Sequence, residues 1–235
     1  MKVLVIIVHT VSGLGGEGKG LALDQSPGRI YDDTIFPSGN QGPGPYNGCM
    51  TKGVFSCILI AAQTADGFIA RHANELSTRW TSKEDANFYR QKSTEAGVIV
   101  MGRSTYETFN KPLPNRVNLV LTRTLPDGVD QVANALSLEK GQVYYTSLSP
   151  QKLIEKLIQL GLNQLAVSGG ASVYQHYVAS GVVTQMWITV EENVHFGQGI
   201  PLFAPDYQLE KDMKLVETID LSPVTKVHHY IKKEA

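Results

Sequence analysis

The sequence predicts an α/β fold with a mainly parallel central sheet, flanking helices and a C-terminal antiparallel hairpin. Short apolar runs alternate with helix-like segments from residue 57 onward, which is typical of strand–helix–strand crossover units. Two of these runs lead through glycine into the start of a helix, at residues 98–107 and 165–174. Alternating stretches at 209–219 and 225–231 flank Ser222 and Pro223, which predicts a terminal pair of antiparallel strands.

Local signals support each expected element. The clearest helix covers residues 150–160, because Ser149 is a suitable N-cap, Pro150 fits the first turn and Gly161 can end the helix. Another helix is expected after Ser82, which also has N-cap character. The expected strands are apolar and often β-branched, at residues 57–62, 98–101, 117–122, 143–146, 165–168 and 186–190.

The first 54 residues differ in composition from the rest of the 235-residue chain. We expect a Gly/Pro-rich N-terminal extension at 1–54, with one strand at 2–8, and a single regular domain at 55–235. The proline-rich run at 37–45 is the expected linker between them. Residues 13–20 match a phosphate-binding loop except that Gly20 replaces the Mg²⁺-ligating Ser or Thr, and no helix follows. We interpret this segment as a flexible glycine-rich loop.

Composition argues against several classes of function. Lys and Arg total 21 against 22 Asp and Glu, so the sequence lacks the basic surplus of nucleic-acid-binding proteins. Its apolar runs are far shorter than the roughly 20 residues that cross a bilayer, and we expect no secretory signal. Two cysteines without C-x-x-C spacing predict neither a metal site nor a redox motif. We therefore expect a cytoplasmic protein that binds a small molecule.

Two segments could bind a flat heterocycle. The strand-like run at 60–69 ends in small residues, which would let a planar ring approach the backbone. In the second segment, Ser82 as N-cap places Asp85 in the first helical turn, with Phe88 and Tyr89 about one turn further on. Asp85 is then either a carboxylate beside aromatic walls or the partner of Ser82 in a capping box. The residues alone favour the capping role.

Two further segments suit a dinucleotide. Residues 98–107 form a buried strand followed by Gly102, Arg103, Ser104 and Thr105, where backbone N–H groups at a helix start favour an anion. Arg103, with Thr122 and Arg123 after the next strand, would suit a 2′-phosphate and hence NADPH. Residues 165–174 place paired glycines before a helix, which lets a pyrophosphate approach the backbone.

Taken in this order, the four segments resemble dihydrofolate reductases, from Cys57 to the C-terminus. The strongest match is Met101-Gly102-Arg103-Ser104-Thr105-Tyr106-Glu107, followed at the family's spacing by Pro112-Leu113-Pro114-Asn115-Arg116-Val117-Asn118. The resemblance implies a dihydrofolate-reductase-like fold and the NADPH-dependent reduction of 7,8-dihydrofolate to tetrahydrofolate, a step of one-carbon metabolism.

The same resemblance assigns roles to individual residues. Asp85 takes the place of the acidic active-site residue, Trp80 that of the tryptophan before it, and Thr189 would hydrogen-bond Asp85. This raises the catalytic role of Asp85 above capping. The positions that line the pterin and benzoyl site are Ile60, Ala62, Tyr89, Phe109 and Leu113, and Arg116 would hold the folate α-carboxylate. The NADPH-contacting positions are Ala62, Ile69, Gly102, Arg103, Ser104, Thr105, Leu121, Thr122, Arg123, Gly169, Gly170, Ala171, Ser172, Val173 and Tyr174.

The sequence departs from the family pattern at several points. Thr81, Ser82 and Lys83 stand where the family commonly has a Leu-Pro turn, and the loop at 70–80 is longer than usual. Ala86 replaces a large apolar residue, and Ser168 replaces an aliphatic one before the paired glycines.

Two alternatives to dihydrofolate reduction stay open. The segment Trp-Thr-Ser-Lys-Glu-Asp at 80–85 is similar to a segment of the riboflavin-pathway reductases. These enzymes share the fold and reduce a ribosylaminopyrimidine phosphate with NADPH. Arg116 favours folate, because only folate offers a glutamate carboxylate. The other alternative is a nucleotide-binding module without catalysis. For the N-terminal extension, an added edge strand, a cover over the active site and assembly into a homodimer all stay open.

Overall fold

The structure is a computed structural model that describes residues 55–73 and 75–234. Three predicted segments lie outside these residues: the strand at 2–8, the glycine-rich loop at 13–20 and the proline-rich linker at 37–45. In chain order the elements are β1 (Ser56–Thr64), β2 (Phe68–Ala70), η1 (Ser77–Arg79), α1 (Lys83–Ala96), β3 (Val98–Gly102), α2 (Arg103–Phe109), β4 (Val117–Leu121), η2 (Pro126–Gly128), β5 (Val143–Thr146), α3 (Pro150–Gln159), β6 (Gln164–Val167), α4 (Ala171–Ala179), β7 (Gln185–Glu191), β8 (Ile200–Pro201), α5 (Leu209–Asp212), β9 (Met213–Ser222) and β10 (Thr225–Lys232).

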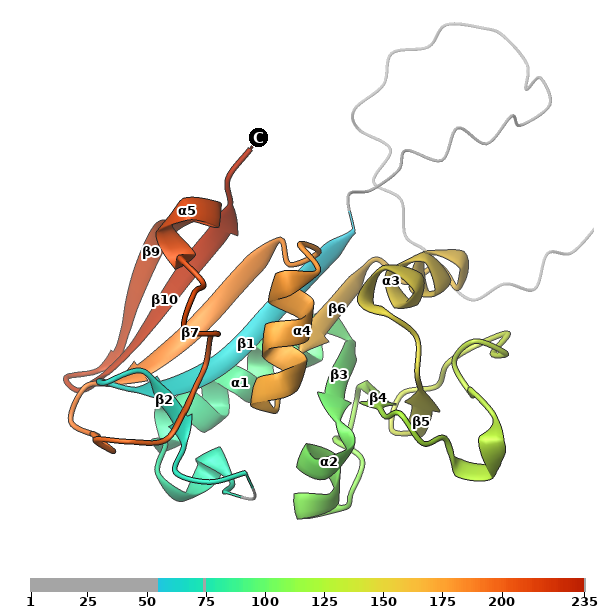
Figure 1. The fold of residues 1–235 in the computed structure, drawn as a ribbon, viewed down its shortest axis with the longest axis horizontal. Helices are drawn as coiled ribbons and strands as arrows, with labels where there is room; N and C mark the ends of the chain where they lie inside the picture. The colour runs from blue at the N-terminus through green and yellow to red at the C-terminus, as the bar shows by residue number, and fades with distance from the viewer. Residues whose placement is uncertain (1–54, 74, 235) are drawn as a thin grey trace, which may run out of the picture. The chain divides into compact units, whose positions relative to one another are not determined.

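One eight-stranded sheet organises the domain, in the order β5-β4-β3-β6-β1-β7-β10-β9 (Figure 1). Neighbouring strands from β5 to β7 are parallel, whereas β10 pairs antiparallel with both β7 and β9. The predicted α/β class, mainly parallel sheet and terminal hairpin are therefore confirmed. The first half of the hairpin differs in detail, because residues 209–212 form the helical turn α5 before β9 begins.

The strands alternate their side chains between two cores on opposite faces of the sheet. Leu59 and Leu165 pack with residues of α3 and α4, whereas Ile60 and Ala166 pack with residues of α1 and α2. Because successive strand residues point to opposite faces, this alternation places the two helix pairs on either side of the sheet. Figure 1 accordingly shows α4 in front of the strands and α1 behind them.

Helix ends follow the predicted caps. The Ser149 side chain accepts a hydrogen bond from the Lys152 N–H at the start of α3, Pro150 occupies its first turn, and Gly161 follows it with φ 75°. Ser82 likewise caps α1, which ends at Gly97 with φ 72°. Of the helices in the described residues, none combines the length and apolar character that crossing a bilayer requires.

Candidate active site

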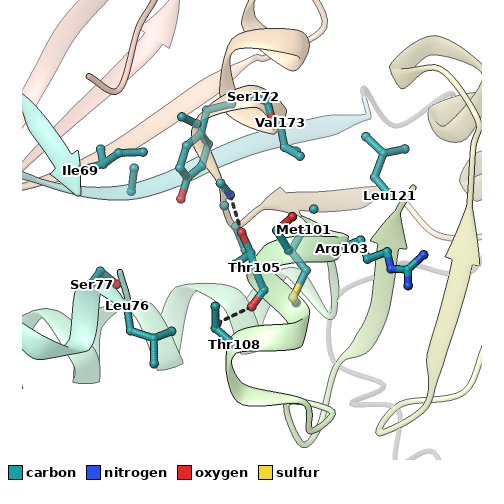
Figure 2. Close-up of a pocket in the computed structure, with 18 of the residues that line it drawn as sticks. Ile69, Leu76, Ser77, Met101, Arg103, Thr105, Thr108, Leu121, Ser172 and Val173 are labelled. Carbon is teal, nitrogen blue, oxygen red and sulfur yellow. Dashed lines mark hydrogen bonds between the residues drawn. The ribbon is translucent and has the colours of Figure 1, made fainter. Parts of the chain in front are cut away.

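A large cleft opens where the parallel strands end. Its volume is about 1610 Å³, and its walls come from the carboxyl ends of β1, β3, β4 and β6, the starts of α2 and α4, and the loop after β2. In Figure 2, Ile69, Leu76 and Ser77 lie on one side of this cleft and Thr105 on the other. Ligands of parallel α/β sheets bind at this edge, because the strand ends expose backbone and helix starts there.

Two strand–glycine–helix turns are fixed to each other at one end of the cleft. The Gly102 N–H donates to the Gly169 carbonyl at 3.0 Å, and the Gly170 N–H donates to Thr105 Oγ1 at 3.1 Å. A Cβ at Gly170 would lie 2.9 Å from Thr105 Oγ1, closer than such atoms normally approach. Glycine is therefore required for this approach, and Figure 2 shows the Thr105 contact as a dashed line.

The start of α4 offers backbone donors to an anion. No hydrogen bond within the described residues uses the N–H of Ala171 or Ser172, as expected for the first turn of a helix. Both residues line the cleft. The helix dipole and these free N–H groups together favour a negatively charged group here.

The cationic and hydroxyl side chains beside this end of the cleft differ in whether they already have partners within the protein. Arg103 Nε lies 2.6 Å from Glu107 Oε1 in an exposed ion pair. Thr122 turns its hydroxyl to the Thr124 carbonyl at 3.0 Å and also accepts the Thr124 N–H, so its predicted phosphate contact competes with its own turn. Ser104 and Arg123 are exposed at the cleft and form no side-chain hydrogen bond or ion pair with other described residues.

At the other end, one carboxylate is buried at the cleft. Asp85 is 7% exposed in the first turn of α1, whereas its neighbour Glu84 is exposed. Burial raises the pKa of Asp85 above its ordinary value, while hydrogen bonds with Thr189 and Thr81 pull the pKa down and the charge of Glu191 raises it. The Glu75 carboxylate, which also lines the cleft, is paired with Arg71.

The helix cap does not occupy the Asp85 side chain. The Asp85 backbone N–H donates to Ser82 Oγ at 3.1 Å, as the capping pattern predicts. The reciprocal bond of a capping box would run from the Ser82 N–H to the Asp85 carboxylate. That N–H instead donates to Glu191 Oε1 at 2.7 Å. The helix cap therefore does not use the Asp85 carboxylate, which is hydrogen-bonded to Thr189 and Thr81 at the cleft.

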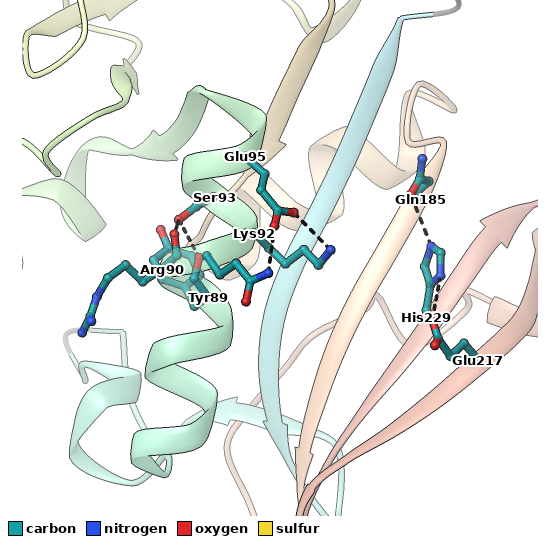
Figure 3. Close-up of polar contacts among 9 residues, drawn as sticks. Tyr89, Arg90, Lys92, Ser93, Glu95, Gln185, Glu217 and His229 are labelled. Carbon is teal, nitrogen blue, oxygen red and sulfur yellow. Dashed lines mark hydrogen bonds and ion pairs between the residues drawn. The ribbon is translucent and has the colours of Figure 1, made fainter.

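The predicted substrate positions come together in the same cleft. Ile60, Ala62, Tyr89, Phe109, Leu113 and Arg116 all line the cleft. Arg116 is 4% exposed, and its Nη1 donates to Ser93 Oγ at 2.6 Å while its Nε donates to the Pro114 carbonyl at 3.0 Å. Ser93 in turn donates to the Tyr89 carbonyl, as Figure 3 shows.

Arg116 has unused capacity for an anion. Among the described residues it has no ion-pair partner, although its guanidinium is buried. A buried cation without a counter-charge is costly, so an anionic ligand would compensate it. Within the same part of the chain, no group of three His, Cys, Asp or Glu side chains is placed to hold a metal ion.

Two predicted residues lie outside the cleft lining. Thr189 is buried on β7 beneath Asp85, which agrees with the expected hydrogen bond between them. Trp80 instead packs edge-on against Phe196, with ring centroids 5.3 Å apart, because η1 and the long loop before it carry the indole toward the segment after β7. The other predicted substrate and cofactor positions all line the cleft.

Sequence reasoning missed several residues at the site. Arg90 and Lys111 also line the substrate end. The only indication of this in the sequence was that each positive charge lies next to or near a predicted contact position. Glu191 was missed because a charged residue just after an expected strand gives no sign that it is buried. Its exposed fraction is 2%.

Known proteins resemble this chain in sequence and fold. The profile of the family described as dihydrofolate reductase matches residues 56–218. A bifunctional dihydrofolate reductase–thymidylate synthase of Paramecium tetraurelia is 38% identical over 104 residues, which cover 44% of this chain and 21% of that protein. The chain thus spans about a fifth of that relative's length.

Solved structures share the fold at low sequence identity. A dihydrofolate reductase from Enterococcus faecalis, complexed with NADP(H) and RAB-propyl, superposes with a TM-score of 0.54 and 19% identity, covering 76% of this chain and 97% of that one. A diaminohydroxyphosphoribosylaminopyrimidine deaminase/5-amino-6-(5-phosphoribosylamino)uracil reductase from Thermotoga maritima gives a TM-score of 0.61 and 15% identity, covering 77% of this chain and 57% of that one. At these levels of identity, both similarities establish a shared fold.

Proposed function

Because the chain belongs to the dihydrofolate reductase family, we propose that it reduces 7,8-dihydrofolate to tetrahydrofolate with NADPH as the hydride donor. The observation that carries this proposal is the pairing of two buried charges in one cleft. Asp85 faces it from α1, and Arg116, without a carboxylate partner among the described residues, faces it from the start of β4. A pterin with a glutamate tail offers a complementary cation and anion.

The cofactor end suits a dinucleotide phosphate. A Cβ at Gly102 would lie 3.1 Å from Val173 Cγ2 and one at Gly170 would lie 2.9 Å from Thr105 Oγ1, so the two glycines allow the close packing of the turns that would hold the phosphates. The N–H groups of Ala171 and Ser172 would bind the pyrophosphate, and Arg123, Ser104 and Arg103 would bind the 2′-phosphate. When bound, NADPH supplies a hydride from C4 of its nicotinamide.

The chain's own residues would align and polarise the substrate. The Asp85 carboxylate would accept hydrogen bonds from the pterin amidine, and its negative charge would raise the basicity of N5, which gains a proton as C6 gains the hydride. Ile60 and Ala62 at the end of β1 would let the flat ring approach the strand, because Ala62 in particular is small. Arg116 would fix the far end of the substrate through its α-carboxylate.

A ribosylaminopyrimidine phosphate is the second candidate substrate, and one observation favours it. Ser168 lines the cleft, and its buried hydroxyl faces the Tyr89 hydroxyl without a well-formed hydrogen bond to any described residue. A buried hydroxyl needs a partner, and the ribose chain of this substrate could supply one where the benzoyl ring of folate could not.

A comparison of the two substrates tests the proposal. We expect NADPH oxidation with dihydrofolate at a kcat/KM at least about tenfold above that with 5-amino-6-ribosylaminouracil phosphate, because specific recognition of a buried polar group discriminates by at least this factor. Asp85→Asn serves as the inactive control. The reverse preference would support the second candidate, and no oxidation with either would leave a nucleotide-binding module.

A further inference from the structure

We propose that Glu191 is the positioning residue of the active site, holding the N-cap of α1 so that the Asp85 carboxylate stays in the cleft. This inference rests on the proposed role of Asp85. Glu191 ends β7 and has a buried carboxylate that the catalytic arrangement above leaves without a role.

The contacts of Glu191 join three elements. Its Oε1 accepts the Ser82 N–H at 2.7 Å, and its Oε2 accepts the Thr225 hydroxyl at 2.8 Å. The Thr225 hydroxyl also lies 3.3 Å from Ser82 Oγ, the atom that caps the Asp85 N–H. Glu191 thereby connects the start of α1 to β7 and to β10.

The arrangement replaces half of a local capping box with a distant residue. Ser82 and Asp85 have capping-box spacing, so the Asp85 carboxylate would be the natural acceptor for the Ser82 N–H. Glu191 already satisfies that N–H. If Glu191 lost its acceptor, the Ser82 N–H would lack a partner, and Asp85 could supply one only by turning its carboxylate away from the cleft.

Charge adds a second effect of Glu191 on Asp85. Within residues 55–73 and 75–234, the ionisable side chains that face Asp85 are Glu191 from β7, Tyr89 from its own helix and Tyr174 from α4. Thr225 from β10 contributes only a hydroxyl. Glu191 is thus the acidic neighbour of Asp85, and its negative charge raises the pKa of Asp85.

Two substitutions of Glu191 separate the effect of its hydrogen bond to the Ser82 N–H from the effect of its negative charge. Glu191→Gln keeps a carbonyl oxygen for the Ser82 N–H but removes the negative charge, whereas Glu191→Ala removes both. We expect Glu191→Ala to lower hydride transfer by on the order of a hundredfold, because small displacements of a reacting group have effects of this size. Glu191→Gln should restore most of that rate. The matched control is Glu192→Gln, since Glu192 is an exposed neighbour that pairs with Lys226.

A measurement on the free protein distinguishes this inference from the proposed function. Carboxyl NMR titration without substrate should show a lower pKa of Asp85 in Glu191→Gln than in wild type or Glu192→Gln. In Glu191→Ala the pKa of Asp85 should fall further than in Glu191→Gln, because the Asp85 carboxylate then accepts the Ser82 N–H in addition to losing its acidic neighbour. Equal Asp85 titrations in the two variants would overturn the inference, and Glu191→Leu replaces Glu191→Ala in both measurements if the alanine variant does not fold. If the two titrations differ as expected but no substrate is reduced, the proposed function fails while the positioning of Asp85 stands.

A double variant tests whether Glu191 acts through Asp85. In an Asp85→Asn background, Glu191→Ala should cause little further loss of hydride transfer, because contacts that act as one unit are not additive. An additional loss as large as in wild type would show that Glu191 acts elsewhere and would contradict the inference.

Discussion

The two ends of the cleft present different chemistry to a ligand. At the cofactor end, backbone N–H groups at the start of α4 and the glycines before it form the surface, and the nearby cations are exposed. At the substrate end, the key groups are the side chains of Asp85 and Arg116, both buried. Side-chain substitutions should therefore have larger effects at the substrate end, whereas the cofactor end should be most sensitive to an added Cβ.

The largest effect on substrate binding is expected for Arg116→Leu. Removing a buried guanidinium that binds a carboxylate should raise the KM for dihydrofolate by about 10- to 100-fold, since charge-assisted hydrogen bonds contribute about 1.5–3 kcal/mol each. NADPH affinity should hardly change. Arg79→Leu, at an exposed arginine outside the cleft lining, is the matched control, and steady-state kinetics with titrated NADPH binding gives both quantities.

A single added methyl group should disturb the cofactor end. In Gly170→Ala the new Cβ would meet Thr105 Oγ1 and weaken the contact between the two glycine turns, so we expect NADPH to bind about tenfold more weakly. Thr105→Val, which removes the same hydrogen bond without adding a Cβ at 170, should have a smaller effect. Isothermal titration measures both, and unchanged binding in Gly170→Ala would contradict the assigned cofactor site.

Cofactor selectivity should depend more on Arg123 than on Arg103. Both are exposed at the cleft, but Arg103 would have to exchange its ion pair with Glu107 for a phosphate. We expect Arg123→Ala to weaken NADPH binding about tenfold with little effect on NADH, and Arg103→Ala to do so only several-fold. Equal losses for NADPH and NADH would place the 2′-phosphate elsewhere.

The smallest effect is expected on stability, where Asp85→Asn should increase the free energy of unfolding and not decrease it. The folded-state pKa of Asp85 is raised, so the folded protein binds more protons than the unfolded chain between the two pKa values, and this group destabilises the fold as pH rises through that window. Asp85→Asn should therefore raise the unfolding free energy at pH 7, with the gain vanishing in acid. Denaturant titrations at several pH values would detect it, and a loss at pH 7 would indicate a structural role.

The sequence predicted those parts of the molecule that depend on nearby residues. The strand at 143–146, the capped helix α3 and both strand–glycine–helix turns follow from local signals, and each lies where it was expected. The family resemblance then placed Asp85, Tyr89 and Arg116 on one cleft.

The remaining features depend on contacts between distant segments. Ser82 and Glu191 are 109 residues apart, and they meet only because β7 pairs with β1 in one register while α1 packs on the same face. The packing of Trp80 against Phe196 likewise depends on the paths of two loops. The short β2–β8 pair was not predicted because its strands are too brief to show a period.

The central claim is that Asp85 carries the chemistry, and single-turnover hydride transfer against pH tests it most directly. Wild type should transfer hydride to dihydrofolate at a rate that falls as pH rises, because N5 must be protonated. Asp85→Asn should keep its fold, shown by an unchanged or higher melting temperature, while its rate drops by on the order of a hundredfold or more and falls more steeply with pH. Near-wild-type rates for Asp85→Asn at every pH would contradict the account and return Asp85 to the role of a helix cap.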